Sequence, residues 1–288
     1  MEQLIQAKDR SGPFFKDKEI EDIFDLKFYH PLGYCIAIFF NRLNFSPNTV
    51  SFISMIIGLI GGALIYYDHL IAASALIVLT SVLDSSDGQL ARMSGKRSVY
   101  GRIIDGLVGY VVFTSIYLAI GFAYYHRYGY IIFVLMILAG VSNAVQNSVY
   151  DFYRTAFLSV SKNDYSDFFD HNRSGFFSMI YDIYNSYQRA LCKWHLKFLS
   201  LVVELKKSKL NTDEIKAYRE KMLKNIQFVN LLGDNWKING IIILSLVGRI
   251  DLFFWYVIIV LNIFLIIALL RQRKIDREII GSWMSKAV

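Results

Sequence analysis

The sequence has few of the residues that build metal or redox sites from sulfur and imidazole. Only two of its 288 residues are cysteines, Cys35 and Cys192, and their separation does not fit a metal-ligand motif. We therefore expect two unpaired thiols. The five histidines also lack partners at metal-binding spacing, so surface or interfacial positions are expected for them.

Other signals are missing as well. There is no internal repeat and no low-complexity segment. Residues 1–18 are polar and lack the apolar core of a signal peptide, so membrane insertion would rely on internal segments. Basic residues are spread over positions that flank apolar runs, and no recognition motif organises them. Nucleic acid is therefore not an expected partner.

Hydrophobic residues, in contrast, are abundant. They make up 55% of the chain, aromatic residues make up 16%, and the mean hydropathy is +0.37. This composition is typical of a membrane protein rather than a soluble domain. The formal net charge of +7 comes mostly from segments between the apolar runs, which suits anionic lipid headgroups.

Six apolar segments are each long enough to cross roughly 30 Å of hydrocarbon with about 20 residues. They are 49–67, 70–90, 103–125, 130–150, 227–247 and 252–270. The predicted fold class is therefore an all-α polytopic integral membrane protein with six transmembrane helices. The fifth segment is the weakest prediction, because Asp234, Asn235 and Lys237 interrupt it.

The first span contains residues typical of a helix start and of close packing between helices. Pro47 stands at or near a first helical turn, where its fixed backbone angle is favourable. Gly58, Gly61 and Gly62 suit close packing against a neighbouring helix. We assign these glycines a structural role and no chemical one.

The chain divides into a membrane core and its polar flanks. The core comprises 49–156 and 223–271, and the flanks are 1–48, a helical insertion at 157–222 and a tail at 272–288. Within the first flank, residues 34–43 read as an amphipathic helix in the membrane interface.

Within the insertion, apolar residues at three- and four-residue steps predict a helix over 181–205. Asn211 or Thr212 is expected to cap a further helix. The insertion would be a pair of interfacial or lid-like helices, a dimer contact or an element that recognises the acceptor.

Lysine and arginine set the orientation of membrane helices. The connection after the second span, the insertion and the tail are basic and fall on one side, whereas the opposite short loops hold only Arg127 and Arg249. Both termini and the second connection are therefore predicted to be cytoplasmic.

A polar constellation lies where the second and third spans reach this side. It consists of Asp84, Asp87, Gly88, Ala91, Arg92, Gly101 and Asp105. Acidic residues at the end of a membrane helix are costly, so a cluster of them indicates a functional site. Ion pathways and structural ion pairs also use such residues, but three acids at one end of two spans fit them poorly.

The chemistry of the constellation points to a divalent cation. Asp84 and Asp87 lie three residues apart on one helical face, where Gly88 and Ala91 leave room beside them. Hard carboxylate oxygens suit Mg²⁺ or Mn²⁺, which usually hold the phosphates of a substrate. We name Asp84, Asp87 and Asp105 as candidate metal ligands.

At these residues the chain resembles the CDP-alcohol phosphotransferase family of membrane enzymes. The family signature reads Asp-x2-Asp-Gly-x2-Ala-Arg-x8-Gly-x3-Asp-x3-Asp, and the seven residues of the constellation match it with every spacing kept. The resemblance implies a six-helix core with a cytoplasmic active site and metal-bound nucleotide. It also implies that Gly88, Ala91, Arg92 and Gly101 contact the CDP group, with Arg92 on a phosphate oxygen.

One signature position departs from the family. Gly109 stands where the family has a fourth aspartate, which completes the metal site and is taken to be the base that activates the acceptor hydroxyl. Another group could supply the base, the acceptor could need none, or catalysis could be lost.

The fourth span offers substitutes. Asn143, Asn147 and Asp151 recur every four residues and Arg154 extends the row, which predicts a polar stripe facing a cavity or another helix. We assign Asn147 and Arg154 to the acceptor pocket and name Asp105 and Asp151 as candidate catalytic residues. Interhelical hydrogen bonds and an Asp151–Arg154 pair explain the stripe equally well.

Three functions fit this pattern. The first is transfer of a phosphatidyl group from CDP-diacylglycerol to a small polar alcohol such as inositol phosphate, glycerol phosphate or serine, with release of CMP. The second is transfer of phosphocholine or phosphoethanolamine from a CDP-alcohol to diacylglycerol or ceramide. The third is a catalytically impaired protein that binds nucleotide or lipid. The expected partners are the donor, the acceptor and membrane lipids, and a homodimer is plausible by resemblance.

Overall fold

Helices make up almost all of the chain that the structure describes. The computed structural model describes residues 18–95, 99–164, 187–206 and 210–284, without the side chains of a few helical residues, Asp105 among them. No strand occurs within these ranges. The all-α fold class is therefore confirmed, and the chain is an integral membrane protein.

The chain folds into two compact units. The first comprises Met1–Gly140 and Asn235–Ile258, and the second comprises Val141–Asp234 and Ile259–Val288. The helix α6, Ile131–Lys162, contributes to both units.

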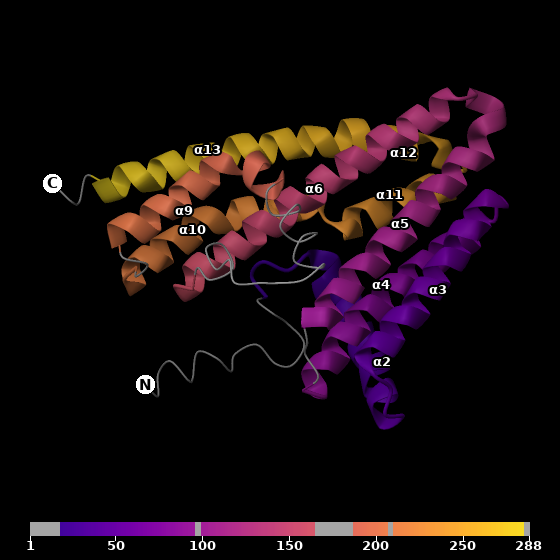
Figure 1. Cartoon of the computed structure of the whole chain (residues 1–288), viewed down its shortest axis with the longest axis horizontal. Coiled ribbons are helices and arrows are strands. Elements are labelled where there is room, and N and C mark those ends of the chain that lie inside the picture. Colours follow the sequence, from indigo (N-terminus) through magenta and orange to yellow (C-terminus); the bar gives the residue numbers. More distant parts are fainter. Residues whose placement is uncertain (1–17, 96–98, 165–186, 207–209, 285–288) are drawn as a thin grey trace. The chain divides into compact units, whose positions relative to one another are not determined.

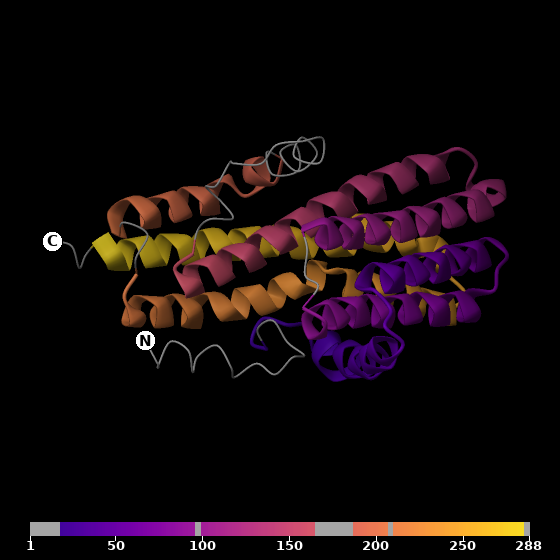
Figure 2. The same cartoon turned by 60° about the horizontal axis from the view of Figure 1, so that its bottom comes forward.

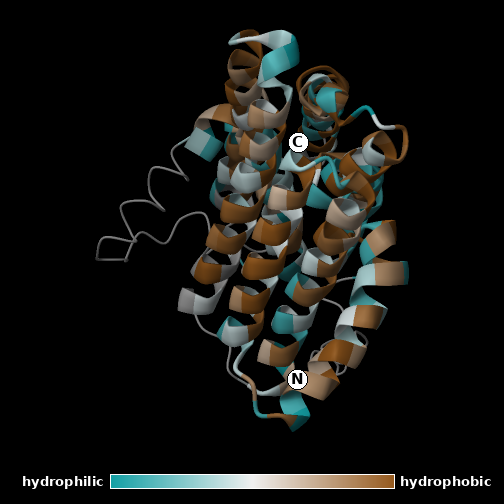
Figure 3. Cartoon of the chain, turned by 90° about the vertical axis from the view of Figure 1, so that its right-hand side faces the viewer, coloured by the Kyte–Doolittle hydropathy of each residue, from teal (hydrophilic) through white to brown (hydrophobic). Residues whose placement is uncertain are grey.

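Within the described part of the chain, five helical stretches are long and apolar enough to cross a membrane. They are Pro47–Tyr66, Leu70–Met93, Gly106–Tyr128, Ile131–Lys162 and Ile250–Ser282. Large apolar side chains along them are exposed, including Ile71 at 71% and Ile137 at 61%, as expected for a surface that faces lipid. Figure 3 shows hydrophobic residues dominating the long helices.

The segment 227–247, which we predicted as a further span, is not one continuous helix. The helix α10, Thr212–Val229, is followed by a 3-10 turn, η3, Asn230–Leu232. Gly233 is extended, and α11, Asp234–Leu246, then begins with an acidic first turn. The polar residues that weakened this prediction therefore mark a helix start, where a carboxylate is stabilised by the helix dipole.

In the first unit, three helices that are adjacent in sequence pack side by side (Figures 1 and 2). They are α3, Pro47–Tyr66, α4, Leu70–Met93, and α5, Val99–Tyr128. Ser46 caps α3 by accepting a hydrogen bond from the Thr49 amide at 3.1 Å, and Pro47 occupies the first turn as predicted.

The glycines of α3 allow this close packing. A Cβ atom added to Gly58 would lie 2.5 Å from Val112 Cγ2, and one added to Gly62 would lie 2.6 Å from Ser115 Oγ, so both face α5. A Cβ on Gly61 would lie 3.2 Å from Ile77 of α4. The predicted packing role of the three glycines is confirmed.

A short π-helix, η2, Asp25–Tyr29, leads into α2, His30–Arg42, which contains the predicted amphipathic helix. This helix lies against α4, since a Cβ on Gly33 would come within 3.1 Å of the Ser86 backbone nitrogen. Ala37 is buried beside α4, whereas Phe39 and Leu43 remain 58% and 51% exposed. An apolar face of this kind suits insertion into the headgroup region.

The second unit is built from α6, α9, Lys193–Lys206, α10 and α13, Asn262–Met284 (Figure 2). Asn211 caps α10 and forms a capping box with Glu214, which confirms the predicted helix start. The helix predicted over 181–205 is observed only from residue 187 onward, because 165–186 lie outside the described residues.

The position of His195 differs from our prediction. We expected it at a surface or interface, but it is fully buried in the second unit, with Nδ1 at 2.9 Å from Asp276 Oδ1. Gln272 donates to the same carboxylate oxygen at 2.7 Å, and Asn225 donates to Gln272 at 2.8 Å. Helices α9, α10 and α13 bury this histidine among hydrogen-bonded side chains, which sequence spacing could not show.

Replacing Gly58 with alanine tests the packing of α3 on α5. The added methyl group must displace Val112, so we expect the variant to lose about 1–3 kcal/mol of stability. The thermal unfolding midpoint in detergent would fall by several degrees. Gly140→Ala is the matched control, because a Cβ there meets no atom within 4 Å and alanine favours the helix. Equal midpoints for the two variants would contradict the packing.

Thiol labelling tests the fold independently. Both cysteines are free, as predicted; Cys35 is exposed, whereas burial raises the pKa of the Cys192 thiol to about 12. Since the thiolate is the reactive form, N-ethylmaleimide at neutral pH should modify Cys35 in the folded protein and Cys192 only after denaturation. Mass spectrometry of the digested protein measures both. Equal labelling of the two thiols in the folded protein would contradict the burial of Cys192.

Candidate functional site

The two aspartates on α4 occupy different environments. Asp84 is exposed, whereas Asp87 is 5% exposed on the side of α4 that faces α3. The Ser51 hydroxyl of α3 donates a hydrogen bond to Asp87 Oδ2. Burying a carboxylate without a hydrogen-bond donor would cost free energy. This bond therefore both stabilises the Asp87 carboxylate and fixes its orientation. Ser51 was not identified from the sequence, since it lies in the apolar first span.

Gly88 leaves a bare strip of backbone one helical turn beyond Asp84. The closest side-chain atom to a Cβ built there is Arg92 Nη1, at 3.6 Å. Ala91, also partly exposed, adds only a methyl group beside this strip. The surface therefore combines accessible backbone, a guanidinium and a carboxylate, which suits an anionic phosphate group and a cation that it carries.

The α5 part of the constellation is described only in its backbone. Gly101 and Asp105 lie in the first two turns of α5, and the side chain of Asp105 falls outside the described residues. Among the described side chains, no three acidic, histidine or cysteine residues form a group that could hold a metal. The carboxylates of Asp84 and Asp87 are oxygen donors of the kind that suits Mg²⁺ or Mn²⁺, and Asp84, Asp87 and Asp105 remain predicted ligands.

Gly109 lies in open space. A Cβ atom built at this position meets nothing within 4 Å. Packing among the described residues therefore does not require glycine here, and an aspartate side chain would find room.

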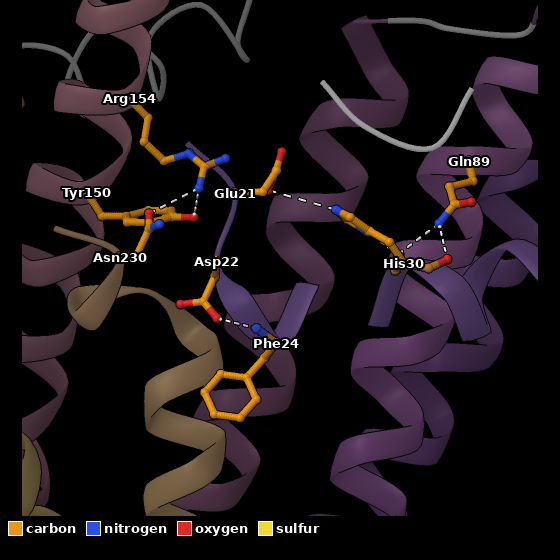
Figure 4. Close-up of polar contacts among 9 residues, drawn as sticks. Glu21, Asp22, Phe24, His30, Gln89, Tyr150, Arg154 and Asn230 are labelled. Atoms are coloured by element: carbon orange, nitrogen blue, oxygen red, sulfur yellow. Dashed lines mark hydrogen bonds and ion pairs between the residues drawn. The ribbon is translucent and has the colours of Figure 1, made fainter. Parts of the chain in front are cut away.

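A chain of polar contacts, missed in the sequence, joins α2 to the signature segment of α4. His30 Nδ1 lies 2.8 Å from Ser85 Oγ, and Gln89 Nε2 donates to Ser85 Oγ at 3.1 Å and to the His30 carbonyl at 3.0 Å. His30 Nε2 lies 3.8 Å from Glu21 Oε2. Figure 4 shows the His30 ring between Glu21 and Gln89. The only signal for this group in the sequence is the i,i+4 spacing of Ser85 and Gln89 within the variable positions of the signature.

The segment that carries Glu21 is anchored at the start of α11. Asp22 Oδ2 accepts a hydrogen bond from Trp236 Nε1 at 3.1 Å, and Asp22 Oδ1 accepts one from the Phe24 amide at 2.8 Å (Figure 4). The Phe24 and Trp236 rings meet edge to face at 5.8 Å. Burial raises the pKa of Asp25, while a hydrogen bond from Asn235 opposes that shift. These contacts hold Glu21 in a defined place.

In the second unit, the predicted stripe on α6 separates into different contacts. Asn147 Nδ2 donates to Asp234 Oδ1 at 3.2 Å, which joins a residue that we assigned to the acceptor pocket to an acidic residue that directly follows Gly233. Asp151 is exposed, and Asn143 is 7% exposed. The stripe thus includes both a buried and an exposed part.

Arg154 is held in a fixed orientation. Its Nη1 donates to Tyr150 Oη at 2.7 Å and to Asn230 Oδ1 at 3.3 Å, and its guanidinium carbon lies 5.0 Å from the centre of the Tyr150 ring (Figure 4). A guanidinium oriented in this way has the planar geometry that suits a phosphate or a carboxylate.

Interhelical hydrogen bonds account for neighbouring polar residues of α6. Gln146 Nε2 donates to Asn262 Oδ1 at 2.9 Å, and Asn262 Nδ2 donates to Ser142 Oγ at 2.9 Å. Gln146 is fully buried, so these bonds satisfy polar groups between α6 and α13. They are structural contacts that the sequence analysis did not single out.

Replacing Ser51 with alanine tests the orientation of Asp87. We expect Mn²⁺ affinity, measured by electron paramagnetic resonance, to fall by about 10- to 100-fold, because the ligand would lose the donor that orients it. Ser54→Ala is the matched control: Ser54 lies one turn further along α3, is also buried and donates to the Thr80 carbonyl at 3.1 Å. Unchanged affinity in Ser51→Ala would show that Asp87 does not bind the metal in this orientation.

Comparisons with known proteins agree with the motif. Residues 44–162 match the family model of CDP-alcohol phosphatidyltransferase. An uncharacterized protein of Aquifex aeolicus (strain VF5) is 29% identical over 102 residues, which cover 35% of this chain and 52% of that protein. The chain thus spans about half the length of the curated relative it matches. No solved structure matches the chain. Members of the matched family are transferases of substituted phosphate groups.

Proposed function

We propose that this chain, whose residues 44–162 match the CDP-alcohol phosphatidyltransferase family, transfers a phosphatidyl group from CDP-diacylglycerol to a small polar alcohol. The observation that carries the proposal is the arrangement on α4. An exposed and an oriented aspartate, a bare glycine and an arginine share one end of a membrane helix. This combination suits a pyrophosphate presented at the membrane surface.

The reaction would be an in-line displacement at phosphorus. The acceptor oxygen forms a bond to the phosphorus that bears the diacylglycerol, the bond from that phosphorus to the CMP oxygen breaks, and CMP leaves. Asp84, Asp87 and Asp105 would hold Mg²⁺ or Mn²⁺, which when bound supplies charge neutralisation at the pyrophosphate. Arg92 would bind a phosphate oxygen, and Gly88 and Ala91 would let the nucleotide approach the backbone.

The apolar surface supports a lipid donor. Side chains of α3, α4 and α5 that point outward are apolar and exposed, so acyl chains can lie against the membrane face while the nucleotide meets α4. With both termini and the signature segment on the cytoplasmic side, the nucleotide would come from the cytoplasm.

Arg154 supports an anionic acceptor. Tyr150 and Asn230 hold the guanidinium in place, and such a group recognises phosphate. Inositol phosphate and glycerol phosphate are therefore the acceptors we infer, ahead of uncharged alcohols. Asn147, hydrogen-bonded to Asp234, would contact acceptor hydroxyl groups.

Release of labelled CMP tests this function with the purified protein in lipid nanodiscs. We expect release with CDP-diacylglycerol plus inositol phosphate or glycerol phosphate and Mg²⁺ or Mn²⁺. Asp84→Asn and Asp87→Asn should each lower the rate by about 100-fold or more, because charge stabilisation at the pyrophosphate is lost. Asp213→Asn, an exposed change in the first turn of α10, should leave the rate unchanged.

Other donors separate the alternatives. Release only from CDP-choline or CDP-ethanolamine, with diacylglycerol or ceramide as acceptor, would replace the proposed donor class. Metal-dependent binding of CDP-diacylglycerol without CMP release from any pair would indicate a binding protein, in keeping with the glycine at position 109.

A further inference from the structure

The missing aspartate at position 109 raises the question of which group takes the proton of the acceptor. Any answer rests on the proposed transferase function. A useful base must have a pKa near neutral pH and must reach the reacting hydroxyl directly or through one hydroxyl or water. His30 has the right chemistry, and its side chain is only 15% exposed.

One hydrogen bond beside His30 has a fixed direction. The Gln89 amide nitrogen can only donate, so Ser85 Oγ accepts from it. The single Ser85 proton is then available for His30 Nδ1, at 2.8 Å. In the tautomer that the relay requires, Nδ1 accepts this proton and the ring proton is on Nε2, which faces Glu21.

Ser85 still has one acceptor site. A hydroxyl oxygen offers two lone pairs, and Gln89 uses one of them. Ser85 is partly exposed, and the relay requires that a substrate hydroxyl reach the second. Such a hydroxyl would donate to Ser85 while Ser85 donates to His30.

The position of Ser85 on α4 places this relay beside the phosphate surface. Gly88 lies four residues beyond Asp84 and three beyond Ser85, so both are its neighbours on the helix. The Arg92 guanidinium reaches the same bare strip. A phosphate group bound over Gly88 would therefore have the Asp84 carboxylate on one side and the Ser85 hydroxyl on the other.

Glu21 would stabilise the protonated ring. Its carboxylate lies 3.8 Å from His30 Nε2, and its side chain is 7% exposed. Glu21 is thus the acidic group that Nε2 faces. Asp25 also interacts electrostatically with His30, from the π-helical turn that precedes it.

Charged residues belong to both elements that meet at His30. Glu21, 3.8 Å from Nε2, Asp22 and Asp25 lie on the segment before His30, and the packed helix α4 carries Asp84, Asp87 and Arg92 in its signature segment.

We propose that His30, acting through the Ser85 hydroxyl, accepts the proton of the acceptor alcohol in place of the aspartate absent at position 109. As the acceptor oxygen bonds to phosphorus, its proton passes to Ser85 Oγ and the Ser85 proton passes to His30 Nδ1. The bond between phosphorus and the CMP oxygen breaks, and CMP leaves with that electron pair. The imidazolium, held by Glu21, then returns its proton to water, and Ser85 ends as the neutral hydroxyl.

The first test compares His30→Gln with the wild-type protein in CMP release. We expect kcat to fall by about 10²- to 10⁴-fold. Equilibrium binding of CDP-diacylglycerol should stay the same, since His30 does not contact the nucleotide. His126→Gln, an exposed change on α5, is the control and should behave as wild type.

The pH profile provides a readout that a structural role would not change. Activity of the wild-type protein should rise with pH as His30 loses its proton, and His30→Gln should lack this limb. Imidazole added to His30→Ala should restore part of the rate.

Two further variants keep the proposal testable if His30→Gln fails to fold. Ser85→Ala leaves His30 in place but removes the relay, and it should lower kcat as His30→Gln does. The double variant His30→Gln, Gly109→Asp should regain activity, because open space at position 109 accepts a carboxylate at the family position of the base.

The outcomes are distinct. A wild-type protein that releases no CMP from any donor overturns the proposed function and this inference together. A wild-type protein that turns over, with His30→Gln and Ser85→Ala matching its rate and pH profile, overturns this inference alone. In that case, loss of activity in Asp151→Asn would assign the base to α6.

Discussion

The burial of Asp87 between two apolar helices is the constraint on which the candidate site depends. A carboxylate placed there needs a donor, and Ser51 of α3 supplies it. The same helix packs closely on its neighbours, through Gly61 on α4 and through Gly58 and Gly62 on α5. The glycines that allow close packing and the serine that orients Asp87 therefore lie on the same helix, α3.

The helix α2 supports the signature segment of α4 in a comparable way, from another side. Gly33 allows α2 to approach Ser85 and Ser86, and Gln89 holds α2 in place by donating a hydrogen bond to the His30 carbonyl. The signature segment is therefore held from two sides, by a membrane helix and by an amphipathic one. A polar segment at a membrane surface would otherwise have many hydrated conformations, and this double support selects one of them.

The two units differ in what their polar residues do. In the first, polar groups border a surface that is accessible from the end of α4. In the second, Gln146 and Asn262 join two helices, and His195 is enclosed with Asp276. Polar residues in apolar helices therefore do not mark a functional site by themselves; their exposure and the direction of their donors decide it.

Much of this could be predicted from the sequence. Hydropathy indicated the membrane helices, the glycine spacing indicated the packing of α3, and Asn211 indicated the start of α10. The seven signature residues indicated the family and the end of the helix where the site lies. These features are local, because each depends on the composition or spacing of residues within a few turns.

The break at Gly233, the burial of His195 and the partners of Asp87 and Ser85 could not be predicted in this way. Each depends on interactions between residues far apart in the chain, such as Ser51 with Asp87 and His30 with Ser85. Sequence alone determined which chemical groups this protein brings to the membrane surface. Only the tertiary structure decided which of them meet, because a hydrogen bond between two helices depends on how closely and in what register they pack.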